Sequence, residues 1–197
     1  MKQILMATKN VGKINEFRHL MEPHGITVLS LLDINYEDEI EETGSTFEEN
    51  ALIKAREIAI QYQVMTIADD SGLEIDALEG RPGVFSARYA GDARSDEANV
   101  DKILFEMKDV PESERYARFV CVLAVVDTEG KELVVRGECT GLILNEKRGT
   151  SGFGYDPIFY LPALGKTMAQ LSKDEKNAIS HRGNAFKLLE ERMDELI

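Results

Sequence analysis

The chain has 197 residues, of which 43% are hydrophobic and 30% are charged, and its formal net charge at pH 7 is −13. This composition is ordinary for a globular protein, and the length suffices for one core with two lobes. The negative charge argues against a nucleic-acid polymer as partner, because binding to a phosphate backbone requires a basic surface. A small anion is not excluded, since it needs only a local group of donors.

The two ends of the sequence and its cysteines indicate where the protein resides. The apolar run near the N-terminus is too short for a signal peptide, and no stretch is long enough to span a membrane. Cys121 and Cys139 lie in strand-like segments, and their spacing fits no metal motif, so we expect free thiols. We therefore expect a cytoplasmic protein without a membrane partner.

The first part of the chain predicts a strand, a polar loop and a helix. Residues 3–7 form a short apolar run, and apolar residues at helical spacing follow the loop until Pro23. The N–H groups and partial positive charge of a helix N-terminus suit a phosphate group, and lysines add full charges. The alternative is an ordinary strand–helix turn with solvated lysines, because the loop lacks the glycines of a Walker A motif. The candidate phosphate-binding residues are Thr8, Lys9, Asn10, Val11, Gly12 and Lys13.

A second strand is predicted over residues 26–31, and residues 33–42 are strongly acidic. We expect most of these acids to lie in a solvated loop, but Glu41 and Glu42 directly precede a helix start. A capping box pairs Ser45 with Glu48 or Thr46 with Glu49, and the helix continues to Tyr62. Lys54 lies at the edge of its apolar stripe, where a lysine either extends toward solvent or points toward a site.

The next segment combines an apolar strand with two adjacent acids. Residues 64–68 predict a buried strand, which ends in Asp69, Asp70, Ser71 and Gly72. Buried adjacent carboxylates are costly unless a partner offsets their desolvation, and Mg²⁺ is a common one. We expect Gly72 to turn the chain there. The alternative is a strand-end turn whose acids are solvated. A short exposed strand over residues 73–77 and a long loop over residues 79–91 are predicted to follow.

The second half of the chain predicts a helix capped by Ser95, a long β-hairpin over residues 117–144, and a glycine-rich loop over residues 149–157. The glycines suit a backbone that passes close to a planar ligand, and the alternative is a flexible loop anchored by one Phe. Two C-terminal helices are predicted, separated at Gly183, the second ending near residue 196. The candidate residues are Phe153, Gly154, Tyr155, Asp156, Lys176, His181 and Arg182.

The candidates combine into one kind of site. Carboxylates suit a metal ion, lysines and hydroxyls suit phosphates, and Phe153 suits stacking on a base. Lys176 and Arg182 are hydrogen-bond donors only, so they favour a 6-oxo purine over the 6-amino group of adenine. The alternative for this basic group is a solvated helix end.

Several motifs in order resemble those of the inosine triphosphate pyrophosphatase family, and the resemblance covers essentially the whole chain. Their combination is specific, although no single motif is. The motifs are Thr8-x-Asn10-x-x-Lys13, Glu41-Glu42-Thr43-Gly44, Phe47-x-Glu49-Asn50-Ala51-x-x-Lys54-Ala55, Ala68-Asp69-Asp70-Ser71-Gly72-Leu73, Pro82-Gly83-Val84-Phe85-Ser86-Ala87-Arg88-Tyr89, Phe153-Gly154-Tyr155-Asp156-Pro157 and Ser180-His181-Arg182-Gly183.

The resemblance implies an α/β fold in one domain, residues 1–197. It implies a long, curved mixed β-sheet whose flanking helices form two lobes around a central nucleotide cleft, and it implies a homodimer. The implied reaction is Mg²⁺-dependent hydrolysis of non-standard purine nucleoside triphosphates (ITP, dITP, XTP) to the nucleoside monophosphate and pyrophosphate, which cleanses the nucleotide pool.

The resemblance also implies residue roles. Residues 8–13 would bind phosphates, Glu41 and Asp70 would hold Mg²⁺, and Asp70 would accept the proton of water, with Asp69 in support and Lys54 as a possible further catalytic residue. The rest of the nucleotide site would be Ser71, Phe153, Gly154, Tyr155, Asp156, Lys176, His181 and Arg182. Lys9 departs from the pattern, since such proteins often have a small residue there.

Three choices stay open at this point. The residues alone do not assign the proton acceptor to Asp69 or Asp70, nor the metal ligand to Glu41 or Glu42. A nucleotide phosphatase and a house-cleaning pyrophosphatase of other base preference are competing enzymes. A nucleotide sensor without catalysis is the competing binding protein, although paired acids at a strand end are unfavourable for binding a polyanion alone.

Overall fold

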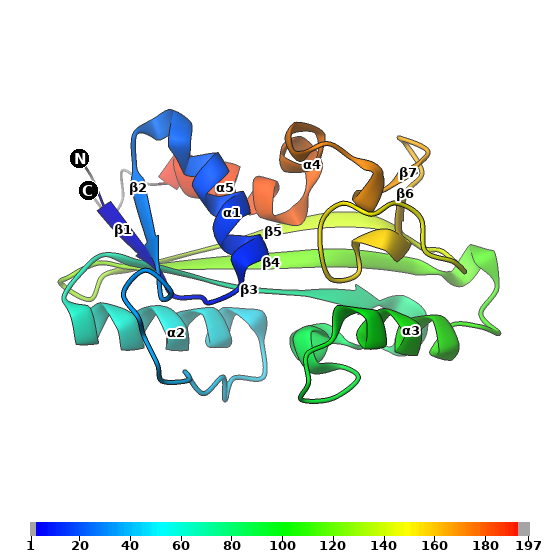
Figure 1. The fold of residues 1–197 in the computed structure, drawn as a ribbon, viewed down its shortest axis with the longest axis horizontal. Helices are drawn as coiled ribbons and strands as arrows, with labels where there is room; N and C mark the ends of the chain where they lie inside the picture. Colours follow the sequence, from blue (N-terminus) through cyan, green and yellow to red (C-terminus); the bar gives the residue numbers. More distant parts are fainter. Residues whose placement is uncertain (1–2, 193–197) are drawn as a thin grey trace. The chain divides into compact units, whose positions relative to one another are not determined.

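A computed structural model describes residues 3–192, and within them seven strands form one sheet in the order β2-β1-β3-β4-β5-β6-β7 (Figure 1). Strand β1 pairs in parallel with β2 and β3, whereas β6 pairs antiparallel with both β5 and β7. The α/β class with a mixed open sheet and flanking helices is therefore confirmed. No helix within the described residues is both long and apolar enough to cross a membrane.

The elements alternate between strands and helices in the first half of the chain and are mostly strands in the middle. The strands are β1 (Gln3–Met6), β2 (Thr27–Ser30), β3 (Thr66–Ile75), β4 (Tyr116–Val126), β5 (Glu132–Ile143), β6 (Phe159–Leu161) and β7 (Lys166–Thr167). The helices are α1 (Val11–Met21), α2 (Phe47–Tyr62), α3 (Asp96–Glu106), α4 (Lys173–Ile179) and α5 (His181–Arg192).

The helix starts follow from the capping residues. The Asn10 side chain accepts a hydrogen bond from the backbone N–H of Lys13 at the start of α1. Of the two capping boxes that the sequence allows at α2, the structure has the one between Thr46 and Glu49. Ser95 caps α3 as expected. Polar residues at these positions therefore fix where the helices begin.

Strand β3 differs from its prediction. The sequence predicts a strand that ends before Asp69 and a separate exposed strand after Gly72, but β3 runs through both without a break. Leu73 and Ile75 are fully buried, so the second segment is not exposed. The prediction was wrong because it required the acids to leave the sheet, whereas basic side chains reach them inside it.

The boundary between the last two helices also differs from the prediction. The break lies at Ser180, whose backbone is extended, and Gly183 lies inside α5. His181 and Arg182 therefore begin α5. A glycine within a helix is tolerated at a modest cost, so it is a poorer boundary signal than a capping serine. The predicted end of this helix at residues 193–196 lies outside the described residues.

The chain divides into two compact units, and strands β3, β4 and β5 each contribute to both. Unit 1 comprises residues 1–70, 121–137 and 182–197, and unit 2 comprises residues 71–120 and 138–181. Two of the motifs are divided by this boundary, since it falls between Asp70 and Ser71 and between His181 and Arg182.

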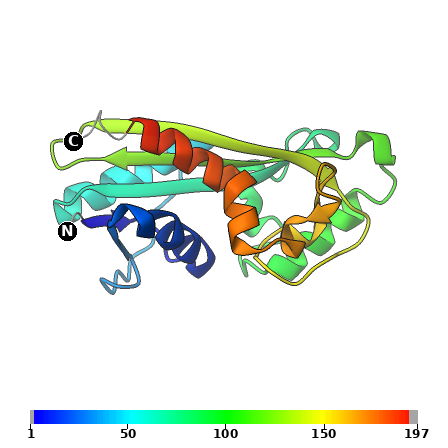
Figure 2. The ribbon, with the colours of Figure 1, turned by 90° about the horizontal axis from the view of Figure 1, so that it is seen from above.

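In unit 1, helices α1 and α5 pack on one face of the sheet and α2 lies on the other (Figures 1 and 2). The cluster beneath α1 and α5 contains Phe17 from α1, Phe186 from α5 and Ile67 from β3. The rings of Phe17 and Phe186 meet edge to face, with their centroids 6.0 Å apart. This packing fixes α1 and α5 above the strand that carries the paired acids.

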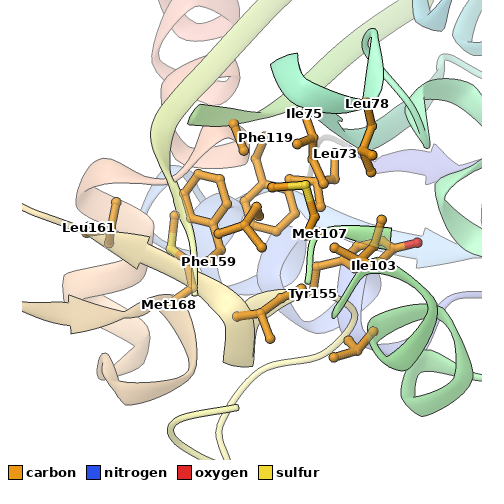
Figure 3. Close-up of a cluster of buried hydrophobic side chains, with 14 of the residues drawn as sticks. Leu73, Ile75, Leu78, Ile103, Met107, Phe119, Tyr155, Phe159, Leu161 and Met168 are labelled. Atoms are coloured by element: carbon orange, nitrogen blue, oxygen red, sulfur yellow. The ribbon is translucent and has the colours of Figure 1, made fainter. Parts of the chain in front are cut away.

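In unit 2, a second buried cluster joins the strands, α3 and the glycine-rich loop (Figure 3). Phe119 of β4 and Phe159 of β6 lie at its centre, with ring centroids 4.3 Å apart. The alternation of β5 places Gly141 against this pair, where an added Cβ would approach the Tyr160 carbonyl oxygen to 2.5 Å. A glycine is required there because the two backbones lie so close.

Candidate active site

The paired acids of β3 are directed to opposite faces of the sheet, because successive side chains of a strand alternate. Asp69 contacts Lys13 of α1 and Arg182 of α5, and Asp70 contacts Lys54 of α2. Both carboxylates belong to unit 1 and both are buried. The two acids therefore have different partners although they are adjacent in the chain.

Asp69 is held as a carboxylate by two cations. Its Oδ2 lies 2.8 Å from the Lys13 Nζ and 3.8 Å from a terminal nitrogen of Arg182. Burial alone would raise the pKa of Asp69, but these two cations and Lys54 outweigh burial and hold the pKa well below its usual range. A carboxylate with so low a proton affinity is a poor general base.

Asp70 has the opposite character. Burial raises the pKa of Asp70, Glu42 and Asp69 add to the rise, and Lys54 and Lys13 oppose it without reversing it. Its Oδ1 lies 3.6 Å from the Lys54 Nζ, while its buried Oδ2 has no hydrogen-bond partner among residues 3–192. Asp70 is thus the more basic of the two carboxylates, and its Oδ2 could accept a proton or bind a metal ion.

Lys54 links Asp70 to the acidic segment that precedes α2. Its Nζ lies 2.5 Å from Glu42 Oε1, and the side chain is buried on the helix. Burial lowers the pKa of Lys54, but Asp70 and Glu42 outweigh burial and raise it overall. Lys54 therefore points to the acids and does not extend toward solvent. Glu42 is partly buried where it contacts Lys54, whereas Glu41 is exposed.

The phosphate loop, residues 8–13, leads from β1 into the first turn of α1. The Thr8 hydroxyl accepts a hydrogen bond from the Asn10 N–H, and Asn10 in turn caps the helix. The N–H groups of the first turn have no partner within a helix, which makes this end suitable for an anion. Lys13 is directed to Asp69, while Lys9 is directed to the acidic segment at residues 37–38.

In unit 2 the glycine-rich loop and α4 form a second group. The Lys176 Nζ lies 2.7 Å from Asp156 Oδ2 and 5.0 Å from the centroid of the Phe153 ring. The same Asp156 oxygen accepts the Phe153 N–H at 3.0 Å. Gly152 has a φ of +80°, and an added Cβ there would meet this oxygen at 2.0 Å. A buried carboxylate thus positions both the aromatic ring and the ammonium group.

Other predicted residues of unit 2 are placed differently from one another. The Tyr155 ring lies in the core, and its hydroxyl donates to the Ser86 carbonyl at 2.7 Å, so only its backbone is available to a ligand. The His181 ring stacks on Phe119, with 4.7 Å between centroids. Ser71 is partly exposed on β3. The Gly154 N–H donates to Asp96 at 2.7 Å.

The sequence predicts that Lys176, His181 and Arg182 form one basic group. All three are buried, so a solvated helix end does not describe them. Arg182 lies in unit 1, where it pairs with Glu16 of α1 as well as with Asp69. Burial lowers the pKa of Arg182, and the two carboxylates raise it overall. Glu16 is not among the predicted site residues, although its position three residues after Lys13 places both on one helix face.

The carboxylates of unit 1 fit a divalent cation whose other ligands are water and the phosphates of a substrate. No group of three or more His, Cys, Asp or Glu side chains within the described residues is arranged to hold a metal alone. Two carboxylates are available for this. One is Asp70, whose buried Oδ2 has no hydrogen-bond partner among the described residues, and the other is Glu42, which pairs with the same Lys54. Mg²⁺ is commonly held by one or two carboxylates together with water and substrate phosphates.

Comparisons with known proteins show that the chain resembles one family over nearly its whole length. The model of the Ham1 family matches residues 4–192. A dITP/XTP pyrophosphatase of Bacillus cereus is 54% identical over 197 residues, which cover 99% of this chain and 96% of that protein. The Ham1 protein of Staphylococcus aureus has a TM-score of 0.87 at 45% identity, covering 100% of both chains. A HAM1 protein of Coxiella burnetii has a TM-score of 0.88 at 44% identity, covering 99% of this chain and 100% of that one.

Proposed function

Because the chain belongs to the Ham1 family, we propose that it hydrolyses the non-standard purine nucleoside triphosphates ITP, dITP and XTP to the monophosphate and pyrophosphate. Curated relatives named dITP/XTP pyrophosphatase match nearly the whole chain at more than half identity. The observation that carries the proposal is the contrast between Asp69, which two cations neutralise, and Asp70, whose pKa burial raises. Clearing such nucleotides from the pool is the corresponding cellular role.

Asp70 is the proton acceptor in this proposal. It takes a proton from water as the water oxygen bonds to the α-phosphorus and the bond to the β-phosphate oxygen breaks, which releases pyrophosphate. Asp69 supports the reaction by holding Lys13 and Arg182 in place. Lys54 holds Asp70 and Glu42, and its charge opposes the repulsion between a triphosphate and the acids.

The residues that would hold Mg²⁺ are Asp70 and one of the two acids before α2. The sequence motif assigns Glu41, and the ion pair of Glu42 with Lys54 supports Glu42. Bound there, Mg²⁺ supplies charge stabilisation to the phosphate oxygens of the substrate.

The remaining predicted residues bind the nucleotide. The phosphate loop supplies N–H groups to the triphosphate, and Phe153 offers a face to the base. Lys176 and Arg182 are donors only, which favours a 6-oxo purine. Ser71, Gly154, Tyr155, Asp156 and His181 complete this set.

Three wider features belong to the same proposal. The two units are the lobes of one nucleotide pyrophosphatase domain, since three strands contribute to both. The protein acts as a homodimer, as the family resemblance implies. It acts in the cytoplasm, where nucleoside triphosphates are used, and its two free cysteines agree with a reducing compartment.

The test is a panel of nucleoside triphosphates (ITP, dITP, XTP, ATP and GTP) incubated with Mg²⁺ and assayed for both phosphate products. Pyrophosphate release from the first three supports the proposal. Orthophosphate release instead identifies a phosphatase, preference for ATP or GTP identifies another base specificity, and tight binding without turnover identifies a sensor.

The matched variant in that assay is Asp70→Asn, which keeps the shape of the side chain but removes its basicity. Loss of a general base lowers the rate by about 10²- to 10⁴-fold. Near-normal turnover of this variant would contradict the assignment of Asp70 as the base.

A further inference from the structure

The acidic segment before α2, residues 33–42, is fixed at its beginning to two neighbours in unit 1. Just before the segment, the Leu31 N–H donates to the Thr8 carbonyl at 3.3 Å, which joins the chain there to the phosphate loop. Tyr36 is buried, and its hydroxyl donates to Glu57 Oε1 on α2 at 3.0 Å. Asp33 adds a further anchor, since its Oδ2 accepts hydrogen bonds from the Ser30 N–H and from Arg18. The segment is therefore held as far as Tyr36 by contacts that do not involve Lys9 or the acids of residues 37–42.

Lys9 extends this attachment to the next two residues. Its Nζ donates to the Asp38 carbonyl at 2.8 Å and to the Glu37 carbonyl at 3.2 Å. It also lies 5.4 Å from the centroid of the Tyr36 ring. A lysine ammonium has three N–H donors, and two of them are used on these carbonyls. The side chain of Lys9 is thus engaged with the acidic segment.

The far end of the segment is attached through the catalytic acids. Glu42 pairs with Lys54, which in turn pairs with Asp70. Four residues of extended chain reach at most about 14 Å, so fixing Asp38 restricts where Glu41 and Glu42 can lie. The repulsion among the acids of residues 33–42 opposes this arrangement, and a positive charge beside their backbone reduces that repulsion.

We propose that Lys9 is a positioning residue that ties the acidic segment to the phosphate loop and thereby keeps the metal-binding carboxylate at position 41 or 42 near Asp70. The N–H groups of residues 8–13, and not the Lys9 ammonium, then serve the phosphates. The consequence for catalysis rests on the proposed function, whereas the tie itself is measurable without substrate.

The first measurement is amide hydrogen exchange of residues 39–42 without metal or nucleotide. In Lys9→Met, which keeps the length but removes charge and donors, exchange rises by about three- to tenfold. Lys9→Arg keeps the donors and stays within about twofold of the wild type. The control is Lys173→Met, the same change at an exposed lysine of unit 2, and it leaves this exchange unchanged. Unaltered exchange in Lys9→Met would overturn the proposal.

The second measurement separates positioning from phosphate binding. With ITP as substrate, Lys9→Met raises the Mg²⁺ concentration for half-maximal rate by about three- to tenfold, and this rise exceeds the change in KM for ITP measured at saturating Mg²⁺. A tenfold rise in KM at every Mg²⁺ concentration would show a phosphate ligand and overturn the proposal. If the wild type hydrolyses no triphosphate, the proposed function fails, and the exchange measurement alone decides the role of Lys9.

Discussion

At the scale of single residues, Asp69 and Asp70 show how environment divides the roles of identical side chains. Asp69 has two cations within 4 Å and is fully buried, so its negative charge is part of the folded structure. At Asp70, burial and the two neighbouring acids Glu42 and Asp69 disfavour the negative charge and raise the pKa. Removing the charge should therefore lower the free energy of unfolding much more at Asp69 than at Asp70.

We expect Asp69→Asn to lower the free energy of unfolding at pH 7 by about 3 kcal/mol, because it leaves Lys13 and the buried Arg182 without their common partner. The folded-state pKa of Asp69 lies below that of the unfolded chain, so its stabilisation is present above pH ~4 and is lost as the pH falls further. Urea unfolding at pH 7 and pH 3 measures this difference. A deficit that does not shrink in acid would contradict the ion-pair explanation.

Asp70→Asn is expected to change the free energy of unfolding by no more than about 1 kcal/mol at pH 7, because it removes a charge that burial disfavours. The same urea experiment provides the measurement, and the activity assay provides its counterpart. A variant that unfolds as easily as Asp69→Asn would show that the two acids are equivalent in stability.

Much of the residue chemistry could be predicted from the sequence. The types of side chain and their order along the chain predict candidates for binding phosphate, a metal ion and the base, and the structure shows which of these candidates are buried and paired. The partner of Arg182 could not be predicted, because Glu16 lies 166 positions away in the chain and only tertiary packing brings them together. The choice between Glu41 and Glu42 needs the direction in which each side chain leaves an irregular segment, which a sequence does not contain.

At the scale of elements, the structure corrects two predicted boundaries, the end of a strand before Asp69 and the break between the last two helices at Gly183. Strand β3 continues through its acids because Lys13, Lys54 and Arg182, on three different helices, reach them. Local patterns contain no information about such partners, so a strand end was the natural prediction. Helix caps, in contrast, depend on neighbours within four residues and were predicted well.

Arg115 provides a test of how unit 2 holds its elements together. Its buried guanidinium donates to the backbone carbonyls of Met107, Val110, Ile143 and Leu144, which joins the residues after α3 to the end of β5. We expect Arg115→Met to lower the free energy of unfolding by about 3 kcal/mol, because buried carbonyls lose their donors.

The control for Arg115 is Arg118→Met, three residues later in β4. Arg118 is 46% exposed and pairs with Glu74, so its loss should cost at most about 1 kcal/mol. Urea denaturation of both variants measures the difference. Equal effects would show that the carbonyl contacts of Arg115 contribute nothing beyond a surface ion pair.

At the scale of the whole molecule, the two units are not successive segments of the chain. Each contains parts of β3, β4 and β5, and the chain crosses the unit boundary within all three strands. The sequence predicts two lobes in one domain, and it shows no linker because none is present. The assignment of residues to the two units could not be predicted, because the boundary falls inside three long strands and depends on what packs against each part of them.

We expect the chain to unfold in a single cooperative transition, because a shared strand cannot lose its pairing in one unit alone without strain in the other. The chain has six tyrosines and no tryptophan, and four of the tyrosines lie in unit 2, so tyrosine fluorescence reports mainly on that unit. Circular dichroism reports on both units. Non-coincident urea transitions by the two methods would show that the units unfold separately.

The continuity of β3 also decides which cations each of the two aspartates contacts. Side chains alternate between the two faces of a strand, so Asp69 is directed toward α1 and α5 and Asp70 toward α2. Their chemistry is the same, and only their positions in the strand differ. A shift of the strand by one residue would exchange the faces of every side chain in it. Buried Ile67, Leu73 and Ile75 prevent that shift, since they would turn to the opposite face. These three apolar side chains therefore hold the register of β3 in which Asp70 is directed toward Lys54.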